Sequence, residues 1–184
     1  MELFPLATVS SPQRFIFKVI LMGDYAVGKT CIIRRYVSDS FSEDYKASIG
    51  VDITSQQLRF ELHEVQLQIW DMSGQTDFRQ VRTQFMSGTD CAILVFDLTR
   101  PSSLDNISSW VNEVYATTPN IPLVLVGNKA DLVNERQVDP EAVKRIINEF
   151  RMLFYIETSA KTGSNVIQLF NDIAQKLLVD ISPD

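Results

Sequence analysis

The chain has 184 residues, of which 45% are hydrophobic and 22% are charged. This length predicts one sizeable hydrophobic core and argues against two domains. The formal net charge is −6 and the lysines and arginines are scattered, so nucleic acid is not an expected partner. No apolar run is long enough to predict a membrane-spanning helix. We expect a short N-terminal tail over residues 1–14, a single domain over 15–180 and a C-terminal tail over 181–184.

Apolar runs separated by polar, turn-forming stretches predict an alternation of strands and helices. The expected strands cover residues 15–22, 51–60, 65–71, 91–97, 121–127 and 152–157. The expected helices cover residues 29–38, 77–86, 102–117, 139–149 and 163–180. Ser102 or Ser103 and Asp139 are the expected helix caps, and Pro140 suits a first helical position.

The connections between these elements predict an α/β fold. Only a short turn around residues 62–64 joins the second and third strands, which therefore form an antiparallel hairpin. Helices link the other strands, so those strands run parallel. The prediction is a six-stranded, mostly parallel sheet with one antiparallel edge strand and helices on both faces. In such sheets, ligands bind at the carboxyl ends of the strands.

The first predicted strand runs directly into Gly23-Asp24-Tyr25-Ala26-Val27-Gly28-Lys29-Thr30, which has the pattern G-x-x-x-x-G-K-T. Between a strand and a helix, this pattern predicts a loop whose backbone N–H groups surround a phosphate. Gly28 permits a close backbone approach, Lys29 reaches the outer phosphates, and the Thr30 hydroxyl is a Mg²⁺ ligand. The chain is therefore expected to bind a nucleoside di- or triphosphate.

A second loop, Asn128-Lys129-Ala130-Asp131, follows the predicted strand at 121–127 and indicates the base. The Asp131 carboxylate can accept two parallel hydrogen bonds from the N1–H and 2-amino groups of guanine. Adenine offers no such pair and would leave a buried carboxylate unpaired, which favours guanine. Lys129 is expected along the base plane, and Asn128 between the two loops. A third loop, Glu157-Thr158-Ser159-Ala160-Lys161, is expected to contact the guanine carbonyl oxygen through its backbone.

Between these loops lies Asp71-Met72-Ser73-Gly74-Gln75, at the end of an alternating strand. An aspartate at a strand end can hold Mg²⁺ through a coordinated water. The Gly74 N–H is expected to meet a γ-phosphate, and Gln75 to orient an attacking water. Alone, this pattern is more typical of a turn after a strand; between two nucleotide motifs, it favours a catalytic loop.

The three motifs, in this order, resemble those of a Ras-superfamily small GTPase over nearly the whole chain, from about Phe15 to Leu178. Four segments most resemble the Rab branch: Ile49 to Asp52, Leu67 to Asp71, Phe96 to Thr99, and Ser109-Trp110. The segment Ala26 to Cys31 is more similar to the Rho branch. The short stretch between Asp131 and Glu157 leaves little room for the inserted helix of Rho proteins.

The resemblance implies the G domain of P-loop NTPases, with GTP as substrate, GDP as product and Mg²⁺ as cofactor. It implies that Phe41 lies edge-on near the guanine, Tyr45 over the phosphates, and Ser48 at Mg²⁺ and the γ-phosphate, where the family usually has Thr. Gln75 and Lys29 would be catalytic, and Thr30, Ser48 and Asp71 would hold the metal. The implied nucleotide contacts are Gly23, Tyr25, Ala26, Val27, Gly28, Lys29, Thr30, Cys31, Phe41, Tyr45, Ser48, Gly74, Asn128, Lys129, Asp131, Ser159, Ala160 and Lys161.

The resemblance also implies a molecular switch. Segments near 39–50 and 74–86 would relax when the γ-phosphate leaves, and partner proteins would read the change. The implied partners are a GTPase-activating protein, a nucleotide exchange factor and effectors, in Rab-like trafficking or signalling. As written, the sequence ends without a terminal cysteine or a basic tail, which predicts no direct lipid anchor. We expect a cytoplasmic protein that meets membranes only through a partner or a tail absent from this sequence.

Departures from the family pattern leave two further hypotheses open. Tyr25 stands where the family usually has a small residue. Its ring either obstructs a partner's arginine, or turns to solvent or supplies a hydroxyl contact. Together with Ser48, it favours a second interpretation: a GTP-bound binding module or scaffold that seldom turns over. A third, a P-loop kinase or ATPase, is disfavoured by Asn128 to Asp131. No built-in catalytic arginine is obvious, and solvated helix faces are expected for Arg34, Arg35, Arg79 and Arg82.

Overall fold

The computed structural model describes residues 12–42, 50–61 and 63–181. Its core is one six-stranded sheet with the spatial order β2-β3-β1-β4-β5-β6. The strands are β1 (Gln13–Met22), β2 (Val51–Phe60), β3 (His63–Met72), β4 (Cys91–Asp97), β5 (Leu123–Asn128) and β6 (Phe154–Thr158). The edge strand β2 is antiparallel to β3, and the other neighbouring pairs are parallel. The predicted α/β topology is confirmed.

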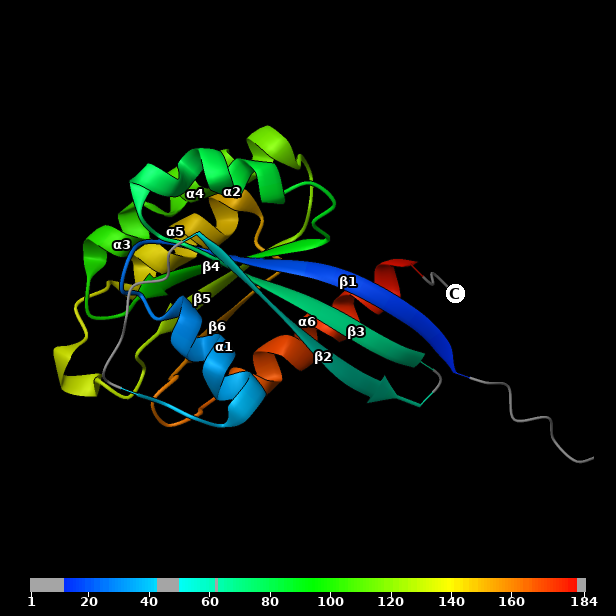
Figure 1. Ribbon diagram of the computed structural model, residues 1–184. Helices are drawn as coiled ribbons and strands as arrows, with labels where there is room; N and C mark the ends of the chain where they lie inside the picture. Colours follow the sequence, from blue (N-terminus) through cyan, green and yellow to red (C-terminus); the bar gives the residue numbers. More distant parts are fainter. Residues whose placement is uncertain (1–11, 43–49, 62, 182–184) are drawn as a thin grey trace, which may run out of the picture.

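Helices cover both faces of this sheet, also as predicted (Figure 1). The helices are α1 (Lys29–Ser38), α2 (Arg79–Phe85), α3 (Pro101–Asp105), α4 (Ile107–Thr117), α5 (Pro140–Phe150) and α6 (Val166–Ile181), with short 3₁₀ turns at Thr76–Phe78 and Val133–Glu135. Helices α1 and α6 lie on one face, and α2 to α5 on the other.

Each face of the sheet buries its own apolar layer, because successive residues of a strand point to opposite sides. In β1, Val19 and Leu21 pack toward α1 and α6, whereas Ile20 and Met22 pack toward α3 to α5. All four are fully buried, and burying such a side chain stabilises a fold by about 1.5–3 kcal/mol. Strand β4 is buried along its whole length. The central strands therefore form a rigid support for the loops at their carboxyl ends.

The helix expected over 102–117 differs most from its prediction. It begins at Pro101 and is interrupted at Asn106, which separates α3 from α4. Neither candidate serine caps it: Ser103 instead accepts a hydrogen bond from the Asp97 N–H (3.0 Å) and donates one to the Arg100 carbonyl (2.6 Å). The serine therefore joins the end of β4 to the new helix.

The predicted start of α5 is confirmed. The Asp139 carboxylate accepts a hydrogen bond from the Glu141 N–H at 3.0 Å, and Pro140 occupies the first helical position. Strand β5 begins two residues later than expected, at Leu123. The helix expected at 77–86 begins instead with a 3₁₀ turn at Thr76–Phe78.

Candidate nucleotide site

The loop after β1 is shaped by two glycines that no other residue can replace without strain. Gly23 has φ 141° and Gly28 has φ 100°, in the region that L side chains rarely adopt. A Cβ at Gly23 would lie 2.1 Å from the Val95 carbonyl oxygen of β4, and one at Gly28 would lie 2.2 Å from the Asn128 amide nitrogen. The loop is therefore packed against β4 on one side and the predicted base loop on the other.

Lys29 lies at the first position of α1 with its side chain turned back into this loop. Its ammonium donates to the carbonyl oxygens of Gly23 and Asp24, both at 2.8 Å, and the residue is only 6% exposed. Burial lowers the pKa of Lys29 from 10.5 to about 8, although the Asp71 and Asp24 carboxylates act in the opposite direction. A buried cation enclosed by backbone carbonyls is suited to contact the phosphates of a nucleotide.

Oxygen ligands from two elements meet beside this lysine. The Thr30 hydroxyl donates a hydrogen bond to the carboxylate of Asp71, which is buried near the end of β3. Hydroxyl and carboxylate oxygens suit Mg²⁺, which usually takes one or two protein ligands together with phosphates and water. Among the described residues, no group of three or more His, Cys, Asp or Glu is placed to hold a metal ion. The donor set therefore fits a phosphate-bound magnesium ion.

Asn128 ties the base loop to its two neighbours, as its predicted position suggested. Its amide nitrogen donates to the Val27 carbonyl at 2.9 Å. Its amide oxygen accepts from the Thr158 hydroxyl at 3.1 Å and from the Ala160 N–H at 3.3 Å. One buried side chain thus joins the loops after β1, β5 and β6.

The side chains expected at the base are held by neighbouring loops. The Lys129 ammonium lies 2.6 Å from the Asp97 carboxylate. Burial opposes ionisation of Asp97, but hydrogen bonds from Lys129 and Thr99 outweigh it and lower the pKa of this carboxyl. Ser159 donates to the Asp131 carboxylate at 2.6 Å. Lys129 and Asp131 are therefore each held by a side chain from a neighbouring loop.

These loops enclose a cavity of about 380 Å³. Its walls bring together nine of the predicted nucleotide residues and two that the sequence did not indicate, Ser42 and Leu132. Cys31 is half-buried here, and burial raises the pKa of its thiol, which stays protonated at neutral pH. The nine predicted residues are Ala26, Gly28, Cys31, Phe41, Asn128, Lys129, Asp131, Ala160 and Lys161.

A second cavity, of about 660 Å³, lies on the other side of the phosphate loop. Its lining includes Tyr25, Gly74 and Gln75, together with Arg100. A Cβ at Gly74 would lie 2.5 Å from the carbonyl carbon of Asp24 and 2.6 Å from the Tyr25 nitrogen, so the two loops are in backbone contact. Gln75 therefore lies next to the phosphate loop, where its predicted role requires it.

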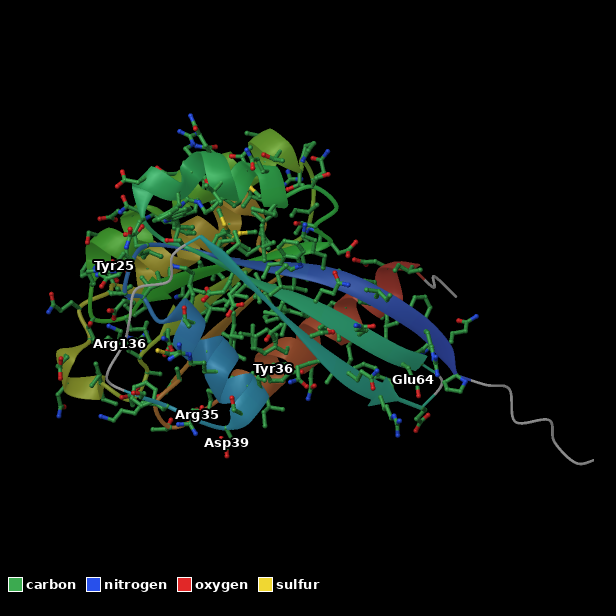
Figure 2. All side chains as sticks on the ribbon, in the orientation of Figure 1. Tyr25, Arg35, Tyr36, Asp39, Glu64 and Arg136 are labelled. Carbon is green, nitrogen blue, oxygen red and sulfur yellow. The ribbon has the colours of Figure 1, made fainter. Side chains whose placement is uncertain are left out.

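Tyr25 is 47% exposed, and Figure 2 places it on the loop beside α3. Its carbonyl oxygen accepts a hydrogen bond from the Arg100 guanidinium at 2.7 Å. Arg100 precedes α3 and was not predicted as a site residue, because the sequence carries no signal that its helix approaches this loop. Tyr45 and Ser48, which were predicted to contact the nucleotide, lie outside the described residues.

The expected positions of the arginines are only partly correct. Arg34 and Arg79 are exposed on helix faces as predicted. Arg35 is half-buried and donates to the carbonyl oxygens of Ala160 (2.9 Å) and Lys161 (2.7 Å), which supports the third loop. The prediction for Arg82 is wrong: the residue is 1% exposed. A buried carboxylate partner on another helix accounts for this burial.

The fold and the three converging loops define a nucleotide-binding α/β domain of the P-loop class. Residues 18–179 match the model of the Ras family. The Ras-related protein Rab-7a of Paramecium octaurelia is 34% identical over 172 residues, which cover 91% of this chain and 84% of the relative. The Ras-related protein RABA4a of Arabidopsis thaliana is 40% identical over 164 residues, covering 89% and 72%.

The chain therefore belongs to the Ras family of small GTPases, enzymes that bind and hydrolyse GTP. Both of these curated relatives carry Rab names, so by homology the chain is Rab-like. Such membership implies regulators and effectors in general. Of the helices that the structure describes, none has the length and apolar character needed to cross a bilayer.

Proposed function

We propose that the protein is a GTP-driven switch in which Gln75 orients the attacking water and Lys29 stabilises charge on the transferring phosphoryl group. One observation carries this proposal: Gly74 packs against the backbone of Asp24 and Tyr25, which brings the Gln75 loop to the phosphate loop. A residue that orients water must lie beside the γ-phosphate, and this contact is the arrangement that such a role needs.

The cavity of about 380 Å³ supports the assignment of the base and sugar end of the nucleotide. In the proposal, Asp131 accepts the guanine N–H pair, Lys129 and Phe41 flank the ring, and the Ser159 to Lys161 loop contacts the guanine carbonyl oxygen. The phosphates lie along Gly23 to Lys29. Tyr45 and Ser48 keep their implied roles over the phosphates and at the metal.

Thr30 and Asp71 would hold Mg²⁺ together with Ser48, whose role the family resemblance implies. When bound, the ion supplies positive charge that offsets the negative charge of the phosphates. The adjacency of the Thr30 hydroxyl and the Asp71 carboxylate supports this placement. The chain's own contribution is to present these oxygens at the junction of the phosphate loop and β3.

In the proposed reaction, water attacks the γ-phosphorus while the bond to the bridging oxygen of GDP breaks. Gln75 fixes the direction of attack, and the Lys29 ammonium attracts the charge that gathers on the phosphate oxygens. Unassisted turnover is expected on the order of 10⁻⁴ to 10⁻³ per second, the range of the family member Ras. An activating partner would accelerate it by adding an arginine.

The biological setting is proposed from the Rab-like character. We infer a role in trafficking or signalling in which an activating protein, an exchange factor and effectors read the segments near 39–50 and 74–86. We place the protein in the cytoplasm, with membranes reached as a peripheral component. The alternative, a GTP-bound binding module with slow turnover, is favoured by Tyr25, a half-exposed residue that lines the same cavity as Gln75.

The test compares Gln75→Leu with Gln80→Leu, a matched change on the exposed face of α2. Single-turnover hydrolysis and GTP affinity are measured for each. Gln75→Leu should slow hydrolysis by roughly ten- to a hundredfold with little change in affinity, because the side chain acts on water rather than on bound nucleotide. Gln80→Leu should match the wild type. Unchanged hydrolysis in Gln75→Leu would reject the catalytic assignment.

Nucleotide carried through purification separates the two candidate functions. Bound GDP supports the switch, and retained GTP supports the binding module. Adenine nucleotides would contradict both, because the Asp131 carboxylate has no hydrogen-bond pair to accept from adenine.

A further inference from the structure

Arg82 of α2 is a charged side chain buried in the interior of the domain, with 1% exposure. Arginine is almost never buried unless it is paired. Here Glu113 of α4 supplies the pair: the Arg82 Nε lies 2.8 Å from Oε1, and Nη2 lies 3.2 Å from Oε2. The carboxylate is itself largely buried. This two-point contact fixes both the position and the plane of the guanidinium.

The remaining guanidinium nitrogen is directed at the catalytic loop. Nη1 of Arg82 donates to the Ser73 carbonyl at 2.8 Å and to the Gln75 carbonyl at 2.6 Å. These two acceptors flank Gly74, the residue in contact with the phosphate loop. The guanidinium therefore holds the backbone on both sides of that contact, including the backbone of Gln75 itself.

The same helix that anchors Arg82 also holds the phosphate loop. The Arg82 guanidinium lies 4.8 Å from the ring centroid of Trp110, one helical turn before Glu113. The Trp110 indole N–H donates to one oxygen of Asp24, and the Asn106 amide donates to the other, both at 2.8 Å. Helix α4 and the residue before it thus fix the two loops that face each other across the proposed γ-phosphate position.

We propose that Arg82 is a positioning residue for GTP hydrolysis, which acts by holding the Gln75 loop at a fixed place relative to the phosphate loop through Glu113 and α4. The inference rests on the proposed catalytic role of Gln75. Loss of the anchor should matter because the rate of hydrolysis depends strongly on geometry: displacing a catalytic group by about 1 Å can change the rate on the order of a hundredfold. Arg82 needs no contact with nucleotide to have this effect.

Arg79 provides a matched control. It lies on the same helix, and its Nε is 3.8 Å from the same Glu113 carboxylate, but its side chain is 70% exposed. Arg79→Gln therefore removes one positive charge near Glu113 without removing the donor to the Ser73 and Gln75 carbonyls. Arg82→Gln removes that donor. Exposed ion pairs contribute little, so the two variants separate charge from loop anchoring.

The experiment measures single-turnover hydrolysis, GTP affinity and amide hydrogen exchange over residues 73–78 in the full chain loaded with nucleotide. Arg82→Gln should slow hydrolysis by roughly ten- to a hundredfold, change affinity by less than about threefold and accelerate exchange in this segment. Arg79→Gln should change none of the three. Arg82→Lys, which keeps the charge and a donor, should recover part of the lost rate.

A Gln75→Leu background identifies the route of the effect. There, Arg82→Gln should add no further loss of hydrolysis, because residues that act as a unit are not additive. An equal loss in both backgrounds would overturn the proposal, as would normal hydrolysis in Arg82→Gln when Gln75→Leu is slow. Normal hydrolysis in Gln75→Leu would reject the proposed function as well.

If Arg82→Gln does not fold, Glu113→Gln provides the same comparison, because it keeps the shape and one acceptor while weakening the anchor of Arg82. The expected results are the same in direction: slower hydrolysis, nearly unchanged affinity and faster exchange over 73–78. Equal losses of affinity and hydrolysis in Glu113→Gln would indicate a purely structural pair and overturn the proposal.

Discussion

Loss of the Lys29 proton at high pH should make a stabilising contribution to the nucleotide-free protein. Burial lowers the pKa of its ammonium from 10.5 to about 8. The difference of about 2.5 corresponds to roughly 3 kcal/mol, at about 1.4 kcal/mol for each tenfold change in proton affinity. Lys29 is almost wholly buried, so solvent does little to screen this energy. This energy is the cost, on folding, of keeping Lys29 charged in the phosphate loop.

The sign follows from which state holds the proton. Between pH 8 and 10.5, the unfolded chain keeps a proton on Lys29 that the folded protein has released, so stability rises with pH in this window. Below pH 8 the penalty is present in full, and above 10.5 it is absent. Between pH 7.5 and pH 10, the free energy of unfolding measured with denaturant should change more favourably in the wild type than in Lys29→Met, by roughly 2–3 kcal/mol. Other titrating groups contribute to both proteins and cancel in the comparison.

Nucleotide binding should raise the pKa of Lys29 again, because negatively charged phosphates favour the protonated ammonium. At pH 8.5, above this pKa, Lys29 is largely neutral in the free protein, so binding of GDP should be accompanied by proton uptake at Lys29. Titration calorimetry in two buffers of different ionisation enthalpy measures this uptake. Lys29→Arg stays protonated and reports the uptake by all other groups. Equal uptake in both proteins, together with equal pH dependence of unfolding in Lys29→Met, would refute the reasoning.

Two further predictions concern the base and the phosphate loop. Asp131→Asn should weaken GTP binding by an amount on the order of several kcal/mol and favour xanthosine triphosphate, because an amide donates where the carboxylate only accepts. Competition binding with the two nucleotides tests this prediction, and a retained preference for GTP would reject the assignment. Tyr25→Gly should raise partner-stimulated turnover and leave unassisted turnover near the wild-type value, because Tyr25 lines the same cavity as Gln75. An unchanged partner-stimulated rate in Tyr25→Gly would reject the hypothesis that the ring obstructs a partner's arginine.

The sequence predicts most of the fold because the fold depends on local patterns. The apolar runs at 91–97 and 121–127 become the central strands β4 and β5, which are buried on both faces. A short turn and helical connections were sufficient to assign the antiparallel edge and the parallel pairs. The motif loops then had to meet at one edge of the sheet. Their convergence around Asn128 follows from topology more than from any single residue.

The missed features depend on contacts between residues far apart in the chain. Arg82 and Glu113 are 31 positions apart and lie on different helices; in sequence, each is an ordinary charged residue of a helix. The break at Asn106 also coincides with long-range contacts, since Ser103 on one side of it is bonded to the end of β4. The Asn106 amide reaches Asp24, a position that the phosphate-loop pattern leaves unspecified. Local reasoning cannot find such partners.

The two glycines of the phosphate loop are required both by the sequence pattern and by packing against distant residues. The pattern states which positions need glycine, whereas the structure gives the neighbours that require it: Val95 of β4 for Gly23, and the amide of Asn128 for Gly28. Because Asn128 also holds Thr158 and Ala160, a side chain at Gly28 would displace the base loops as well as the phosphate loop. The spacing of the motif is therefore a packing constraint on all three loops, because the contact between Gly28 and Asn128 joins the predicted phosphate loop to the predicted base loops.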